Sequence, residues 1–529
     1  MKGILLYLLL LVSYVYSAQV RVDPLVLISS QGLIRGHAAT DGDYSIFLGI
    51  PYAQVDETNP FGPALDPPPF HEIIHDAVDS VKCPQAYSSS IGETMLDCLR
   101  LNIYVPSQAH SRNPLPVLVW IHGGDFATGS AGDYGVRNLV RHGVVVVTMN
   151  YRLGPYGFMC LNIPSMPGNQ GLKDQFDALR WIRKNIASFG GNPYNVTIAG
   201  QDAGATSALL HLYSDWDKLF HKVIIESGTP QSEGMFVNAD IDAALKLAEY
   251  LGFNTSDTED ALQFLGKSSP DLVTGAAVDL GLQLRPCTER FFSGISNLVQ
   301  DNPYSMSNKG KVANTAILIG NTNKELNSLS GDYFNSDPFY VKIRNNFDLE
   351  EHQFVQAATN VRHFYIGDQP ISPEVSSELE DFETDFVYNH PSQRVITRLL
   401  EDNAGAIYEY LFSYISNSDA DGAGHSSELN YLFEVGGNLQ RTKEDQLIVD
   451  RMTTLWTNFI KFGNPTPRTS ELVPVAWKPV TASTRPTMII DTNLRLDSRV
   501  DQQRMAYWDL FYTMYGRYNN IARSVCTIV

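Results

Sequence analysis

The feature of the sequence that most limits its fold is a series of short, β-branched-rich apolar runs that alternate with amphipathic segments. LPVLVWIHGG (115–124) and GVVVVTMNYR (143–152) end in glycine or polar residues, as buried strands of a parallel sheet do. GLKDQFDALRWIRKNIASFG (171–190) repeats apolar residues every three or four positions, which predicts an amphipathic helix that stops at Gly190 and Gly191. This alternation predicts an α/β fold with a large, mostly parallel central sheet flanked by helices.

The same alternation continues almost to the end of the chain. Further strands are expected at NVTIAG, HKVIIESG, TAILIGNTN, AIYEYLFSY and TMIIDTN. Helices are expected from Ala203, at DIDAALKLAEYLG and at KEDQLIVDRMTTLWTNFIKFG. No repeat, low-complexity tract or Pro/Ser-rich linker divides the sequence, so residues 18–529 are predicted to form a single domain with long insertions.

The first residues predict export from the cell. Residues 1–17 combine Lys2, an apolar run and small residues near Ser17, as a cleaved secretory signal does. No later run reaches the roughly 20 apolar residues needed to span a bilayer. The net charge is −19, and removing Lys2 with the signal makes it −20, which disfavours nucleic acid and anionic membranes as partners. A secreted, extracellular protein is expected.

The five cysteines and two glycosylation sequons fit that location. Cys83 and Cys98 are nearest in sequence and are expected to form a disulfide. Cys160 is expected to be a buried thiol, Cys287 has no obvious partner, and Cys526, near the C-terminus, could reach a second subunit. The sequons begin at Asn254, which is expected to be exposed, and at Asn195, which abuts a strand and is expected to be less accessible.

The stretch NVTIAGQDAGATSALLHL (195–212) reads as a strand, a sharp glycine-flanked turn and a helix. A nucleophile elbow needs small residues two positions before and two after the reactive residue, because neighbouring backbone approaches closely there. Gly200 and Gly204 meet this requirement. The residue between them, however, is Asp202, where an esterase would have serine.

Ordered motifs along nearly the whole mature chain resemble those of the type-B carboxylesterase and cholinesterase family. The matching strings are GLIRG, GIPYA, DCLRLNIYVP, WIHGG, NYRLGPYGF, PGNQGLKDQFDALRWI, FGGNPYNVTIAG, SGTP, GHSSELNYLF and WTNFIKFGNP. The resemblance implies an α/β-hydrolase fold. So many matches in the expected order are specific for the fold and less decisive for activity.

The resemblance also implies roles for individual residues. Glu325 matches the acid and His425 the general base of a catalytic triad whose serine position is Asp202. Gly124, Asp125 and Ala203 match the oxyanion-hole donors. Ser227 matches a hydroxyl beside the triad, and Cys83 with Cys98 the first disulfide.

Two departures from the family pattern carry negative charge into the site. Asp125 replaces a glycine, and its carboxylate is expected to project toward the oxyanion space. Losing one oxyanion donor costs roughly 2.7 to 4 kcal/mol, and losing the serine costs on the order of a millionfold in turnover. Asp202 beside His425 should favour imidazolium. If Asp125 approaches Asp202, either one carboxyl keeps its proton or a cation binds between them.

The leading hypothesis is a secreted, catalytically inactive carboxylesterase-like protein that binds an extracellular protein or a small apolar ligand. It resembles non-catalytic members of the family such as glutactin and neurotactin. The alternative is a hydrolase with Asp202 as nucleophile, or residual carboxylic-ester hydrolase activity. No cofactor and no metal are expected. A homodimer through the C-terminal helices KEDQLIVDRMTTLWTNFI and QQRMAYWDLFYTMYGRY, with Cys526, is left open.

Overall fold

The computed structural model describes residues 24–72, 74–75, 81–86, 93–416, 421–435 and 441–522. The expected signal at residues 1–17 and Cys526 lie outside the described residues. None of the helices within these ranges has the length and apolar content to cross a membrane.

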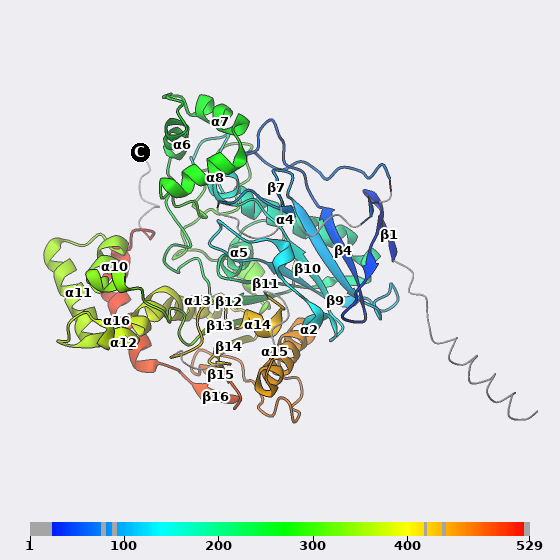
Figure 1. The fold of residues 1–529 in the computed structure, drawn as a ribbon. Coiled ribbons are helices and arrows are strands. Elements are labelled where there is room, and N and C mark those ends of the chain that lie inside the picture. Colours follow the sequence, from blue (N-terminus) through cyan, green and yellow to red (C-terminus); the bar gives the residue numbers. More distant parts are fainter. Residues whose placement is uncertain are drawn as a thin grey trace, which may run out of the picture.

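Within the described residues, eleven strands form one central sheet (Figure 1). In spatial order they are β16 (Arg495–Ser498), β15 (Pro486–Ile490), β14 (Ile407–Phe412), β13 (Ala316–Thr322), β12 (Lys222–Glu226), β11 (Gly191–Gln201), β9 (Leu115–Ile121), β10 (Val145–Met149), β8 (Arg100–Pro106), β4 (Tyr44–Pro51) and β3 (His37–Ala38). The seven strands from β15 to β10 pair in parallel, and the outer strands pair antiparallel. The expected mostly parallel sheet is therefore confirmed.

Two smaller sheets and the helices surround this sheet. The small sheets contain β1 (Leu25–Ile28), β2 (Gly32–Arg35) and β5 (Ile74–His75), and β6 (Val81–Lys82) with β7 (Glu93–Thr94). The first helices are α2 (Arg137–Val140), α3 (Gly154–Phe158), α4 (Gln170–Asn185), α5 (Ala203–Tyr213), α6 (Ala243–Tyr250), α7 (Thr258–Lys267), α8 (Pro270–Asp279) and α9 (Lys309–Val312). They are followed by α10 (Pro338–Asn346), α11 (Glu351–Ile366), α12 (Ser376–Thr384), α13 (His390–Glu401), α14 (Leu429–Leu432), α15 (Lys443–Phe462) and α16 (Gln502–Tyr515).

Both faces of the central sheet are covered, because successive side chains of a strand point to opposite faces. Ile198 packs in one apolar cluster while its neighbour Ala199 packs in another, and Val223 and Ile224 divide in the same way. A third cluster joins α10, α11 and α12 to α16, and Figure 1 shows these helices together at one end of the molecule.

The helix expected at 171–190 ends earlier than its apolar repeat suggested. α4 stops at Asn185, and a 3₁₀ turn over Ile186–Phe189 follows it. Gly190 then takes φ 76°, the left-handed conformation that glycine adopts without strain.

Two disulfides cross-link the described chain. Cys83–Cys98 is confirmed. The expectation of a free thiol at Cys160 is wrong, because Cys160 is bonded to Cys287. The two are 127 residues apart in sequence, and the fold brings their Cα atoms to 6.6 Å.

Candidate functional site

The residues of the candidate site stand where several parallel strands end. Asp202 follows β11, and the loop that carries Gly124 and Asp125 follows the neighbouring strand β9. Glu325 follows β13, and His425 lies beyond β14. Open α/β sheets bind ligands at the carboxyl ends of their strands, where neighbouring connections diverge. The topology thus collects residues from four segments at one edge.

The turn at Asp202 has the sharp geometry expected of a nucleophile elbow. Asp202 takes φ 57° and ψ −120°, and α5 begins at the next residue. A Cβ on Gly200 would lie 2.3 Å from the backbone of Gly204, and one on Gly204 would lie 2.0 Å from the carbonyl oxygen of Ile121. Only glycine fits at either position, so the local strain is built into the sequence.

The carboxylate of Asp202 binds two of the backbone N–H groups that are predicted to form the oxyanion hole. Its Oδ2 accepts hydrogen bonds from the backbone N–H groups of Gly124 and Asp125, both at 2.9 Å. These are two of the three donors that the sequence predicts; Ala203, the first residue of α5, stays a predicted donor. A substrate carbonyl oxygen would need the same two N–H groups. The side chain therefore competes with an ester for the position where negative charge would develop.

The Asp125 carboxylate has a partner that the sequence did not indicate. This side chain is 64% exposed, and its Oδ2 lies 3.4 Å from the guanidinium of Arg285. Asp125 takes φ 59°, which directs its N–H toward Asp202 while its carboxylate faces Arg285. The Asp125 carboxylate is still close enough for its charge to interact with Asp202 and His425.

His425 and Glu325 are arranged as the acid–base pair of a triad. His425 Nδ1 lies 2.6 Å from Glu325 Oε2, and the Ser227 hydroxyl donates to Glu325 Oε1 at 2.6 Å. The Thr322 N–H also donates to Oε1, at 2.7 Å. Glu325 is fully buried, and these donors hold it in one orientation. The predicted neighbourhood of Ser227, Glu325 and His425 is therefore present.

The surrounding charges keep His425 protonated at neutral pH. Burial lowers its pKa, but Glu325 and Asp202 outweigh burial and raise the pKa to about 9. Asp202 Oδ1 lies 3.9 Å from His425 Nε2. The side-chain nitrogen Nε2 of Gln201 lies 2.8 Å from the same ring nitrogen. Because an amide nitrogen only donates, a protonated ring requires this amide to be turned over so that its oxygen faces His425. An imidazolium has no lone pair with which to activate a nucleophile.

Three side chains near the site carry no recognised sequence signal for their roles. Gln201 bonds His425, Arg285 pairs with Asp125, and Glu428 is fully buried three residues after His425. Burial and the nearby Glu325 raise the pKa of Glu428 to about 8, so that it is neutral at pH 7. Gln201 lies inside the elbow motif, and its contact could have been suspected. Arg285 is 160 positions from Asp125, so the contact between them could not have been suspected from the sequence.

The two sequons differ in accessibility as expected. Asn254 is exposed, whereas the Asn195 amide is bonded within the fold to Lys461 and Lys222. Glycosylation of either residue stays a prediction. In the ranges that the structure describes, no group of three or more His, Cys, Asp or Glu side chains is arranged to hold a metal ion.

The chain is similar to known proteins over most of its length. The model of the Carboxylesterase family matches residues 22–508. Juvenile hormone esterase of Heliothis virescens is 31% identical over 484 residues, covering 82% of this chain and 85% of the relative. Esterase FE4 of Myzus persicae is 29% identical, covering 90% of each chain. Bile salt-activated lipase of Rattus norvegicus is 28% identical, covering 92% of this chain and 84% of the relative.

A solved structure supports the fold. The crystal structure of juvenile hormone esterase from Manduca sexta, with OTFP covalently attached, superimposes with a TM-score of 0.80. The two sequences are 27% identical, and the match covers 93% of this chain and all of that chain. The expected α/β-hydrolase architecture is confirmed.

Proposed function

The chain belongs to the carboxylesterase family, and from that premise we propose that it is a secreted member that has lost acyl transfer and acts by binding. The proposed ligand is an extracellular protein or a small apolar molecule. One observation carries the proposal: Asp202 Oδ2 accepts the N–H groups of Gly124 and Asp125 that a substrate carbonyl would need. The protein thus presents a carboxylate where the reaction requires both a hydroxyl and unoccupied donors.

Three further observations support the same proposal. With a pKa of about 9, His425 is protonated at pH 7 and is not a base. The relatives are named as an esterase for juvenile hormone and a bile salt-activated lipase, names that favour apolar ligands for this scaffold. Two disulfides and the apolar start of the chain favour secretion.

The first test is an ester hydrolysis assay at pH 7.5. The purified protein is expected to hydrolyse p-nitrophenyl acetate and butyrate within about twofold of its Glu325→Ala variant, because neither protein holds a hydroxyl nucleophile. Release of p-nitrophenol well above that control, together with its loss in His425→Ala, would contradict the proposal.

A second candidate function is hydrolysis of epoxides with Oδ1 of Asp202 as the nucleophile. Because Oδ2 is held in the oxyanion hole, Oδ1 faces the imidazole of His425. Oδ1 could attack the carbon of an epoxide, whose C–O bond breaks as a C–O bond to Asp202 forms. The imidazolium then gives its Nε2 proton to the new alkoxide, leaving a hydroxyalkyl ester and a neutral His425. Water activated by that imidazole would attack Cγ and release a diol, with the oxyanion on Oδ2.

This candidate predicts a covalent adduct on Asp202. The protein is incubated with styrene oxide or 1-iodobutane, quenched in acid and mapped by peptide mass spectrometry. Asp202→Asn is the matched control, since it keeps the shape of the side chain and removes the nucleophilic oxygen. An adduct at Asp202, absent from the control, would establish alkyl transfer. Unmodified peptide with no diol formed would exclude it for these reagents.

Of the two C-terminal helices considered for a homodimer contact, α16 is the better candidate. The apolar side of α15 is used inside the subunit, where Ile448, Leu455 and Phe459 are fully buried. α16 instead leaves Leu510 65% and Met514 54% exposed. On α15 the one large apolar residue that is exposed is Phe462, the last residue of the helix, so the homodimer contact is proposed on α16.

A further inference from the structure

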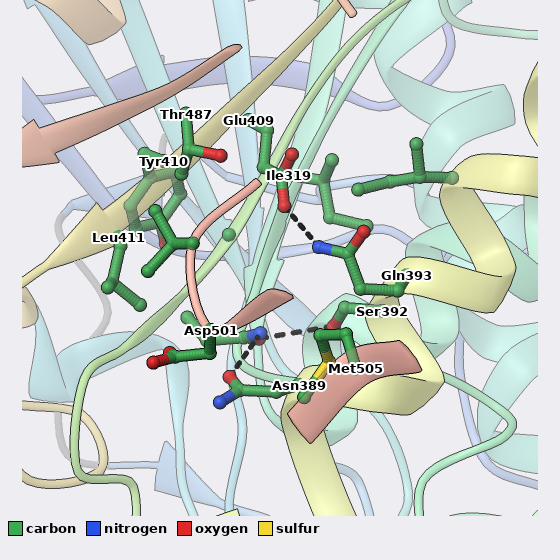
Figure 2. Close-up of a pocket in the computed structure, with 14 residues that line it drawn as sticks. Ile319, Asn389, Ser392, Gln393, Glu409, Tyr410, Leu411, Thr487, Asp501 and Met505 are labelled. Carbon is green, nitrogen blue, oxygen red and sulfur yellow. Dashed lines mark hydrogen bonds between the residues drawn. The ribbon is translucent and has the colours of Figure 1, made fainter. Parts of the chain in front are cut away.

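Two cavities away from Asp202 differ in what they can hold. Figure 2 shows a polar cavity among β13, β14, α13 and the start of α16, with the Glu409 carboxyl bonded to the Gln393 amide. Its volume of about 30 Å³ has room for a water or two. The second cavity, along α4, has a volume of about 610 Å³, the size of sites for small organic molecules. Its lining includes none of the triad or oxyanion-hole residues.

The α4 pocket has an apolar body. Phe176 and Trp216 meet edge to face with ring centroids 4.6 Å apart, and Pro63, Pro164 and Ile295 extend the wall around them. The Trp216 indole N–H is already bonded to the carbonyl oxygen of Asn297, which fixes the ring. Aromatic and proline side chains of this kind bind apolar ligand surface with little loss of conformational entropy.

One wall of the pocket is held in place by covalent and hydrogen bonds. The segment from Pro164 to Pro167 runs between Cys160, which is bonded to Cys287, and Asn169. The Asn169 side chain donates to the carbonyl oxygen of Cys287 at 2.8 Å and accepts its N–H at 3.0 Å. This wall of the pocket is thus held in place before a ligand binds.

Gln170 supplies the polar feature of the pocket. It lines the pocket at the start of α4, and only 1% of it is exposed. Within the described part of the chain, neither its Nε2 nor its Oε1 has a hydrogen-bond partner. Buried amides are nearly always paired, because an unpaired one loses its bonds to water without replacement. Both amide atoms are themselves buried, so the side chain must adopt another rotamer before either can contact a bound molecule.

The charges around the pocket restrict the chemical class of ligand that could pair with Gln170. The Lys173 ammonium is matched by Glu289 at 3.3 Å and the Arg180 guanidinium by Asp177 at 3.1 Å. Asp215 and Asp217 add negative charge to the lining, which disfavours a carboxylate ligand. An amine could offer only a donor, whereas Gln170 needs both a donor and an acceptor.

We propose that the α4 pocket binds a small, mainly apolar molecule that carries a primary amide or lactam group paired with Gln170. Such a group presents a donor and an acceptor side by side, the complement of a glutamine side chain. The ring of the ligand would lie against Phe176 and Trp216. The lining of this pocket does not include Asp202, so the proposal does not depend on the chemistry at the elbow.

Calorimetric titration of the full-length protein with four matched probes tests the proposal. The probes are 3-phenylpropanamide, the ketone 4-phenylbutan-2-one, 3-phenylpropanoate and 3-phenylpropylamine. The amide is expected to bind at least about tenfold more tightly than the ketone, which lacks the donor. The Gln170→Leu variant should bind the amide only as well as the ketone.

Two controls separate pocket binding from effects on folding. Ile295→Trp, a change in an exposed loop at the pocket rim, should abolish binding of every probe even if Gln170→Leu fails to fold. Asp202→Asn should leave all four affinities unchanged. Equal affinities for the amide and the ketone, preference for the acid or the amine, or amide binding that survives Ile295→Trp would each overturn the proposal.

Discussion

Replacing Asp202 by serine and Asp125 by glycine is expected to produce an esterase that hydrolyses p-nitrophenyl acetate on the order of a thousandfold faster than the parent chain. Serine supplies the missing hydroxyl. It also removes the carboxylate that occupies the N–H groups of Gly124 and residue 125, so that a substrate oxygen can bind there. Glu325 and His425 are already 2.6 Å apart and need no repositioning.

The same substitution is expected to change the ionisation of His425. In the parent chain Glu325 and Asp202 together raise its pKa to about 9, although burial opposes them. Without the Asp202 charge the pKa falls, and the ring becomes a base nearer neutral pH. Activity of the variant should therefore rise with pH as the imidazolium loses its proton. Imidazole NMR titration of both proteins should give the lower pKa in the variant.

The free energy of unfolding should also depend on the ionisation of His425. A histidine whose pKa is raised by folding contributes stability that is fully present below its unfolded pKa of about 6.5. That contribution is lost as pH rises toward 9 in the parent chain. Between these two pH values, the free energy of unfolding of the parent chain should fall by more than that of the double variant.

Two controls identify the source of any new activity. Adding His425→Ala to the double variant should return the rate to that of the parent, since the serine would lose its base. Asp202→Ser alone, which keeps the Asp125–Arg285 pair, should show whether Asp125 also impedes the substrate. A folded double variant no faster than the parent would mean that the triad geometry at Glu325 and His425 is no longer competent.

Local patterns made much of the fold predictable. The strands over 115–121 and 145–149 and the elbow at Gly200 and Gly204 are encoded by neighbouring residues, and all of them are present. The triad positions of Glu325 and His425 came from ordered family motifs, and the structure brings the two side chains together.

What escaped prediction depends on contacts between distant segments. The Cys160–Cys287 bond spans 127 residues, and cysteine counting offers no rule for it. The ion pair of Asp125 with Arg285 joins residues 160 positions apart, and nothing in the sequence indicates it. The hydrogen bonds of Asp202 to the N–H groups of Gly124 and Asp125 likewise depend on how β9 and β11 lie beside each other. The use of α15 in the core likewise depends on tertiary packing, because its apolar stripe alone suits either burial or a dimer contact.

The second large effect is expected at a buried ion pair that joins the loop after β10 to α4. Arg152 and Asp174 are 1% and 0% exposed, and the guanidinium donates to both carboxylate oxygens, at 2.8 and 2.6 Å. The two N–H groups of its Nη1 donate to the carbonyl oxygens of Pro60 and Gly62. Four of the five N–H groups of the cation are thus bonded inside the protein, and removing the carboxylate leaves a buried charge without compensation.

Asp174→Asn is therefore expected to lower the free energy of unfolding by about 3 to 5 kcal/mol, measured by urea denaturation. Asp497→Asn is the matched control, because its exposed pair with Arg495 should contribute less than about 1 kcal/mol. The double variant Arg152→Met, Asp174→Leu should be more stable than Asp174→Asn, since it removes both charges and fills the space with apolar atoms. A single variant within 1 kcal/mol of the parent would mean that water reaches the guanidinium, and the double variant would then offer no gain.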